Sequence, residues 1–253
     1  MGRLHTIGVL GGMGPEETVL FMQKMLGAVT PSDDADHIPL LVDSNSQVPS
    51  RISAILEGTG DDPAPVLVQM ARRLAASGAK ALAMPCNTAH YYAPQIVTAV
   101  DVPLLNMLDL SCAYGAEVAG HSARIGLLGS PALQQTKVFE APLAGHGLGA
   151  VYANDQPNVL AAIRDIKANG PTEAARETLV RTVAEMAEGG ASAICVCCTE
   201  FSLLTDRIEA PVPLFDSLDL LVNACVSFSK EGLDDADPTP NRHVAHRSSA
   251  THA

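Results

Sequence analysis

The hydrophobic pattern of the chain switches repeatedly between short apolar runs and longer amphipathic stretches. Residues 6–26, "TIGVLGGMGPEETVLFMQKML", join an apolar run, a glycine turn and a helix-like period, and the apolar run "PLLVDSN" follows at 39–45. Helix-like residues 63–78 then lead to strand-like segments at 79–86 and 100–108. Short apolar runs separated by amphipathic segments are typical of parallel strands joined by helices. The first half therefore predicts an α/β unit with a parallel sheet.

The second half repeats this order. A strand, turn and helix are expected over 123–140, a strand over 150–154, a helix over 172–190 and a strand over 191–198. The segment "SGAKALAMPCNTAH" aligns with "GGASAICVCCTEFS", and "VPLLNMLD" aligns with "VPLFDSLD". This internal duplication predicts an α/β fold with two pseudo-symmetric lobes, each a parallel sheet flanked by helices.

The repeat also suggests how the chain is divided. We assign residues 1–112 and 211–230 to the first lobe and residues 113–210 to the second. Residues 231–253 have few large apolar side chains, so we expect a disordered tail there. Because sites in open α/β sheets form beyond the carboxyl ends of the strands, the two lobes should face each other across a cleft.

Composition restricts the partners of such a fold. The 253 residues are 47% hydrophobic and carry a formal net charge of −12, which argues against nucleic acid or an anionic membrane as partner and leaves a small charged metabolite possible. We find no apolar run of membrane-spanning length and no signal-peptide core, so we expect a cytoplasmic protein. Cysteines need not pair in that reducing compartment.

The segment "ICVCCTEFS" places Cys195, Cys197 and Cys198 within four positions, where thiols could be metal ligands, disulfide partners, core residues or catalytic groups. A zinc site needs a second ligand pair with matching spacing, which the sequence lacks. The duplication sets Cys198 opposite Cys86, each at a strand end and each followed by polar residues expected to begin a helix. A helix N-terminus lowers the pKa of a thiol and holds anions. Cys86 and Cys198 are therefore the catalytic candidates.

The remaining cysteines are interpreted as packing residues. Cys195 and Cys197 have no cysteine opposite them in the repeat, and Cys112 and Cys225 lie inside helix-like segments. His90, one helical turn after Cys86, either tunes that thiol or serves as a capping or partly buried histidine. The glycine turn "GVLGGMGPE" lacks both the spacing of a dinucleotide fingerprint and the lysine of a P-loop.

Three motifs, "GVLGGMGPE", "MPCNTAH" and "CTEFSLL", together resemble the aspartate/glutamate racemase family, and most closely its aspartate racemase branch, over about residues 6–230. The resemblance implies a racemase that works without pyridoxal phosphate, metal or other cofactor, and a homodimer. It also implies a pair of catalytic cysteines, Cys86 and Cys198, that act as two bases on opposite faces of the α-carbon of an acidic amino acid, aspartate or possibly glutamate.

The resemblance further implies a set of substrate contacts. Arg51 and Lys167 match the cations that hold the side-chain carboxylate in aspartate racemases. The remaining expected contacts are the segment after Cys86, its mirrored positions after Cys198, the glycine turn, the loop after the second strand and a hydroxyl of the second lobe: Asn87, Thr88, Ala89, Thr199, Glu200, Met13, Asn45 and Ser130.

The chain departs from the family pattern in places. Leu133 occupies a position where the family usually has threonine, Lys137 one where it usually has a small residue, and Cys197 one where glycine is common. These departures leave the shape of the side-chain pocket and the identity of the substrate undecided. Two alternatives to racemisation are kept. One is a cysteine-dependent decarboxylase or cis-trans isomerase of a small dicarboxylic acid, and the other is a two-lobed ligand-binding protein without catalysis.

Overall fold

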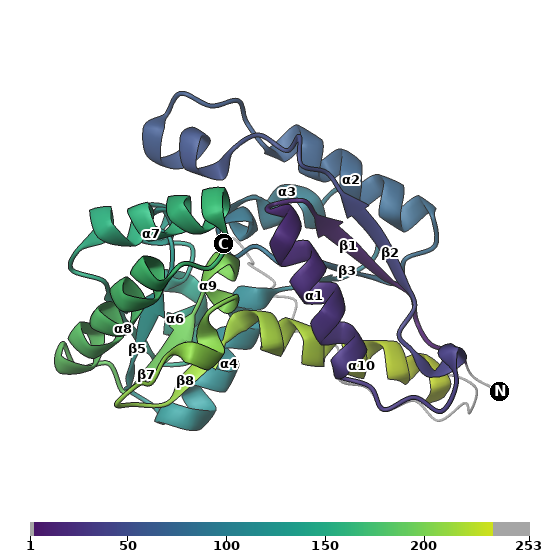
Figure 1. The fold of residues 1–253 in the computed structure, drawn as a ribbon. Helices are drawn as coiled ribbons and strands as arrows, with labels where there is room; N and C mark the ends of the chain where they lie inside the picture. The colour runs from purple at the N-terminus through teal and green to yellow at the C-terminus, as the bar shows by residue number, and fades with distance from the viewer. Residues whose placement is uncertain (1–2, 235–253) are drawn as a thin grey trace, which may run out of the picture.

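The computed structural model describes residues 3–234 and contains two parallel four-stranded sheets flanked by helices (Figure 1). The strand orders are β2-β1-β3-β4 and β6-β5-β7-β8, so the two sheets have the same topology. Ile7 of β1 lies between Leu40 and Ala81, just as Ile125 of β5 lies between Ala150 and Ala193. The predicted fold of two pseudo-symmetric α/β lobes is confirmed.

The elements of the first half follow the expected alternation, with short 3-10 or π turns between them. They are β1 (Ile7–Gly11), α1 (Pro15–Gly27), η1 (Asp34–Asp36), β2 (Leu40–Ser44), η2 (Ser53–Glu57), α2 (Ala64–Ala76), β3 (Ala81–Ala83), η3 (Thr88–Tyr92), α3 (Ala93–Val97), β4 (Leu104–Leu105) and α4 (Met107–Ala119). The central strands β1 and β3 are fully buried, as continuous apolar runs in a sheet covered on both faces should be.

The second half repeats the series. Its elements are β5 (Arg124–Leu128), α5 (Pro131–Thr136), α6 (Glu140–Gly145), β6 (Gly149–Tyr152), α7 (Gln156–Asn169), α8 (Glu173–Glu188), β7 (Ala193–Val196), α9 (Thr199–Ser202), η4 (Thr205–Arg207), β8 (Leu214–Asp216) and α10 (Ser217–Asp234). Within the described residues, none of the helices has both the length and the hydropathy needed to cross a bilayer.

The two lobes exchange their last helices. Leu108 and Cys112 of α4 pack in one core cluster with Ile125 and Phe215 of the second lobe. Conversely, Leu218, Leu221 and Val222 of α10 pack with Ile7 and Val9 of the first lobe. Figure 1 shows α10 running below the first sheet and α4 below the second. Each lobe is therefore completed by a helix from the other half of the chain.

The structure differs from the expected division of the chain at three points. Leu108 and Cys112 of α4 pack in the second lobe, although residues up to 112 were assigned to the first. β8 pairs with β7 in the second sheet, although residues 211–230 were assigned as a whole to the first lobe. The predicted start of the tail at residue 231 is also too early, because α10 continues to Asp234. The rest of that segment, 235–253, lies outside the described residues.

Candidate active site

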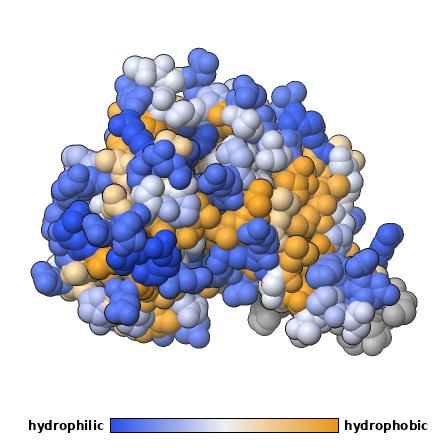
Figure 2. Space-filling model, viewed as in Figure 1, coloured by the Kyte–Doolittle hydropathy of each residue, from blue (hydrophilic) through white to orange (hydrophobic). Residues whose placement is uncertain are grey.

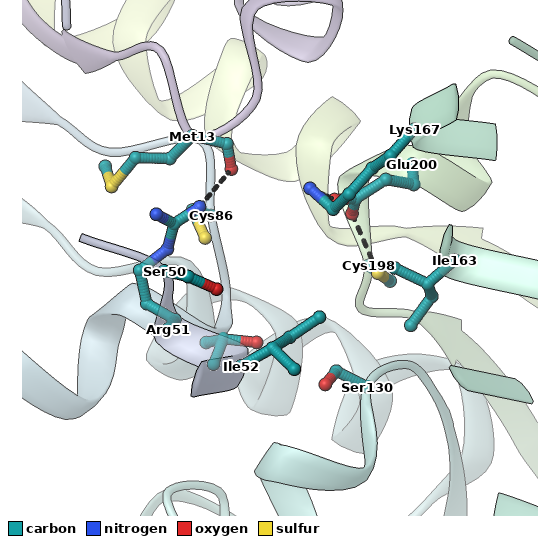
Figure 3. Close-up of a pocket in the computed structure, with 11 residues that line it drawn as sticks. Met13, Ser50, Arg51, Ile52, Cys86, Ser130, Ile163, Lys167, Cys198 and Glu200 are labelled. Atoms are coloured by element: carbon teal, nitrogen blue, oxygen red, sulfur yellow. Dashed lines mark hydrogen bonds and ion pairs between the residues drawn. The ribbon is translucent and has the colours of Figure 1, made fainter. Parts of the chain in front are cut away.

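A pocket with about 380 Å³ of empty space, its open mouth included, lies between the two lobes. Its lining comes from both halves of the chain: Met13, Ser50, Arg51, Ile52, Cys86, Thr88, Ser130, Ile163, Lys167, Cys198 and Glu200. Cys86 and Cys198 lie on opposite sides of this pocket (Figure 3). The cleft expected at the carboxyl ends of the strands is therefore present, with both candidate thiols at its walls.

Each candidate cysteine follows a central strand of its sheet. Cys86 lies shortly after β3, and Cys198 follows β7 and precedes α9. The two residues keep only 8% and 7% of their surface exposed. Because β3 and β7 occupy equivalent positions in the two sheets, the internal duplication itself places the two thiols face to face.

The helices after the cysteines are shorter than the sequence suggests. Cys86 and Asn87 precede a single 3-10 segment, η3, and α9 after Cys198 has only four residues. The expected lowering of the thiol pKa is wrong for Cys198. Burial and then the adjacent Glu200 carboxylate raise its pKa well above the usual range, and Lys167 offsets this only in part.

Glu200 contacts both Cys198 and Lys167. The Cys198 thiol donates a hydrogen bond of 2.9 Å to Glu200 Oε2, while Glu200 Oε1 forms an ion pair with Lys167 in the last turn of α7. Burial alone would lower the pKa of Lys167, but the Glu200 charge raises it overall. Cys198 is thus held as a protonated thiol beside a charge-paired lysine.

Arg51 is held differently from Lys167. Its guanidinium donates to the carbonyl oxygens of Pro49 at 3.1 Å and of Met13 at 3.2 Å. Its Nε is buried without a hydrogen-bond partner, and no carboxylate of the described residues lies within ion-pair distance. A fixed, charged fork of donors without an acid partner suits a carboxylate ligand.

Eight of the twelve expected site residues line the pocket, and four do not. Ala89 is fully buried in the core of the first lobe, and Thr199 is buried beside Cys198. Asn45 accepts a hydrogen bond from the backbone N–H of Gln47 in its own loop. Asn87 is buried and contacts Ser217.

Three lining residues were not predicted: Ser50, Ile52 and Ile163. Sequence signals for them exist. Ser50 and Ile52 flank Arg51 in the same loop, and Ile163 lies one helical turn before Lys167 on α7, where residues four apart share a face.

Both ring nitrogens of His90 form hydrogen bonds with backbone groups. Its Nε2 accepts a hydrogen bond of 3.1 Å from the backbone N–H of Met107, so the proton must reside on Nδ1, which donates to the carbonyl oxygen of Cys86 at 2.9 Å. Burial lowers its pKa to about 4, which keeps it neutral. His90 therefore fixes the backbone at Cys86 to the start of α4.

The other cysteines lie in the hydrophobic cores. Cys112, Cys195 and Cys197 belong to the cluster beneath the second sheet, and Cys225 packs beneath the first. Across the described residues, no group of three or more His, Cys, Asp or Glu side chains is arranged to hold a metal ion.

Known proteins resemble this chain in sequence and in overall fold. The chain is 27% identical over 232 residues to the broad specificity amino-acid racemase RacX of Bacillus subtilis, covering 87% of this chain and 96% of that protein. The aspartate racemase of Picrophilus torridus superposes with a TM-score of 0.78 at 26% identity, covering 90% of this chain and 98% of that one. Glutamate racemase of Francisella tularensis shares the fold, with a TM-score of 0.62 and 16% identity over 92% of this chain and 82% of that one.

The sequence profile of the Asp/Glu/hydantoin racemases matches residues 10–225. The match starts in β1 and ends in α10. It therefore includes the two cysteine turns, residues 84–92 around Cys86 and residues 196–204 around Cys198. The chain therefore belongs to the Asp/Glu/hydantoin racemase family, which confirms the resemblance seen in its three motifs.

Proposed function

We propose that this chain racemises an acidic amino acid, aspartate first and glutamate second, with Cys86 and Cys198 as its two bases and no cofactor. The observation that carries the proposal is one pocket that has a cysteine on each of two opposite sides (Figure 3). Inverting an α-carbon requires that one group removes its proton from one face and another delivers a proton to the opposite face.

The protonation of Cys198 sets the starting state for one direction. Its thiol donates to Glu200, so it is the acid, and Cys86 as thiolate removes the α-proton. The electron pair left on the α-carbon spreads into the substrate carboxylate, and the Cys198 thiol then delivers its proton to the other face. In the reverse direction Glu200 takes the Cys198 proton, the resulting thiolate removes the α-proton, and the Cys86 thiol delivers one.

The two cations support an acidic substrate. Arg51 is charged and has no acid partner in the described residues, whereas Lys167 is compensated by Glu200. We infer that Arg51 is the main anchor of the side-chain carboxylate and that Lys167 contributes less. The similarity to an aspartate racemase supports this substrate class. Because another relative is a broad specificity amino-acid racemase, neutral amino acids must be tested too.

We also expect a homodimer in the cytoplasm. Val19 and Leu26 of α1 and Val42 of the edge strand β2 are exposed, and Figure 2 shows hydrophobic residues gathered on this side of the first lobe. Exposed apolar patches of this kind often mark contacts between subunits.

The deciding experiment measures both enantiomers of a panel of amino acids, without pyridoxal phosphate, by chiral chromatography. Aspartate should be racemised fastest. Replacing Cys86 or Cys198 by Ala should lower racemisation by about 10²- to 10⁴-fold, as loss of an acid or base does. In D₂O each variant should retain α-hydrogen exchange with only one enantiomer, and the two variants should retain it with opposite ones.

Two outcomes would contradict the proposal. Exchange lost for the same enantiomer in both variants would mean that the thiols do not act on opposite faces. Release of CO₂ or isomerisation of a double bond in a dicarboxylic acid, with no change of amino-acid configuration, would favour the decarboxylase or cis-trans isomerase alternative.

A further inference from the structure

Asn87 follows Cys86 directly in the chain, yet it is not among the residues that line the pocket. Its amide nitrogen donates a hydrogen bond of 2.8 Å to Ser217 Oγ, and Ser217 Oγ donates one of 2.9 Å to the carbonyl oxygen of Val196. Asn87 is 2% exposed and Ser217 is fully buried. These three groups form a continuous buried polar bridge between the lobes.

The direction of each hydrogen bond in this bridge is fixed by its chemistry. A serine hydroxyl has a single hydrogen, which Ser217 gives to Val196, so it can only accept from the Asn87 amide. The Oδ1 atom of Asn87 is buried and has no partner in the structure. If either Asn87 or Ser217 moved out of this arrangement, further buried polar groups would lose their hydrogen-bond partners.

The bridge joins the two cysteine turns. Asn87 is adjacent to Cys86, whereas Val196 ends β7 two residues before Cys198. Ser217, between them, is the first residue of α10, the helix that the second half of the chain contributes to the first lobe. A displacement of one turn against the other would break the bridge.

A second pair of contacts fastens the same turns to the exchanged helices. His90, four residues after Cys86, accepts from the N–H of Met107 at the start of α4. Ser202, four residues after Cys198, donates to Asp216, which precedes α10. The equivalent position in each repeat thus holds its cysteine turn to the helix that covers the opposite lobe.

We propose that Asn87 and Ser217 are positioning residues that hold Cys86 and Cys198 on opposite faces of one carbon atom, in place of the substrate contact expected for Asn87. This inference rests on the proposed two-thiol function. Two bases must meet the same α-carbon from both sides, and displacement of such groups by about 1 Å costs on the order of 10²-fold in rate.

The chain offers a matched control for Ser217. Ser229 lies on the same helix, is also fully buried and also donates its hydroxyl hydrogen to a backbone carbonyl, that of His5, remote from the cysteines. The experiment therefore compares Ser217→Ala, Asn87→Ala, the double variant and Ser229→Ala. Circular dichroism and thermal unfolding show which of them are folded, and Asn87→Ala serves alone if Ser217→Ala is not.

Kinetics provide the first readout. Ser217→Ala and Asn87→Ala should each lower kcat by about 10- to 100-fold for both enantiomers with little change in KM, because the reacting geometry is lost and not a binding contact. The double variant should lose little more than either single variant, since each removes the same bridge. Ser229→Ala should keep wild-type kcat. Losses that multiply in the double variant, or a raised KM with unchanged kcat in Asn87→Ala, would overturn the proposal.

Hydrogen exchange provides a readout that does not depend on catalysis. Amides in both cysteine turns, residues 84–92 and 196–204, should exchange faster in Ser217→Ala and in Asn87→Ala and should be unchanged in Ser229→Ala. Faster exchange in only one turn would mean that the bridge does not couple them. A wild-type protein that racemises no amino acid would refute the proposed function, and the exchange comparison would then decide the bridge by itself.

Discussion

Arg51 and Lys167 show how two cations at one pocket differ in what they can bind. Lys167 has 37% of its side chain exposed and is paired with Glu200, so part of its field is already neutralised. Arg51 donates only to backbone carbonyl oxygens, which carry no full charge. In the proposed function, a substrate carboxylate therefore gains most from Arg51, whose planar fork can bind two oxygens at once.

Replacement of Arg51 by Ala should lower kcat/KM for the racemisation of aspartate much more than for that of a neutral amino acid. Loss of a charge-assisted, two-pronged contact costs on the order of 2 to 3 kcal/mol, or about 30- to 150-fold in kcat/KM. The matched control is Arg73→Ala, because Arg73 pairs with Asp43 outside the pocket and should leave both activities unchanged. Equal losses for acidic and neutral substrates would remove Arg51 from the side-chain site.

Substitution of Glu200 by Gln should make the Cys198 thiol more acidic. The Glu200 charge raises the pKa of Cys198 and Lys167 lowers it, so removing the negative charge favours the thiolate. Alkylation of Cys198 by iodoacetamide, followed by mass spectrometry across pH, should show a midpoint below that of the wild type. Glu173→Gln, at an exposed ion pair, provides the control. A midpoint that stays or rises would mean that Glu200 does not hold the thiol proton.

At the scale of secondary structure, the two exchanged helices begin in the same way. Asn106 caps α4 by accepting from the N–H of Leu108 at 2.9 Å, and Asp216 accepts from the N–H of Leu218 at 2.8 Å. Asn106 and Asp216 are aligned in the repeat, so one capping position is kept with two different residue types. The carboxylate is the costlier one to bury.

Replacing Asp216 by Asn should therefore stabilise the protein only above mildly acidic pH. Burial raises the pKa of Asp216 to about 6 from 3.8, against hydrogen bonds from Leu218 and Ser202; Asp219 raises it further and Lys24 opposes this. The folded state binds this proton more tightly than the unfolded state. The stabilisation of the folded wild-type protein by this proton is therefore complete below pH 3.8 and is lost as pH rises through about 6. The loss is on the order of 3 kcal/mol.

Calorimetric Tm values at pH 4, 5, 6 and 7 test this expectation. The two proteins should have similar Tm values at pH 4, and the Tm of the variant should exceed that of the wild type by an increasing amount as pH rises. His90, with its pKa lowered to about 4, acts in the opposite direction, so the wild type alone shows little net slope from this pair. A difference in Tm that does not depend on pH would show that Asp216 is ionised throughout.

For the whole molecule, the exchange of α4 and α10 makes the lobes interdependent. The core beneath the first sheet includes Leu218 and Leu221, and the core beneath the second includes Leu108 and Cys112. Neither half of the chain covers its own sheet completely. The pocket between the lobes is consequently built on a frame in which each cysteine turn is fastened to the helix that packs on the opposite sheet.

Local patterns are sufficient for much of this description. Apolar runs and amphipathic periods predict the strands and most helices, and the repeat pairs Cys86 with Cys198 without reference to coordinates. The racemase family follows from the motifs that contain them. These features could be predicted because they depend on residue order within one segment or on the comparison of two segments.

Other features depend on which segments meet in space. The sequence assigned residues 211–230 to the first lobe, which is right for α10 and wrong for β8, and residue order did not reveal that the Asn87 side chain bonds to Ser217. Burial and hydrogen-bond partners come from residues more than a hundred positions apart, as with Asn87 and Ser217. Residue order determined the two-lobed fold and its pair of cysteines; the tertiary structure decided how each thiol is held, because a pKa and a bridge are properties of neighbours in space.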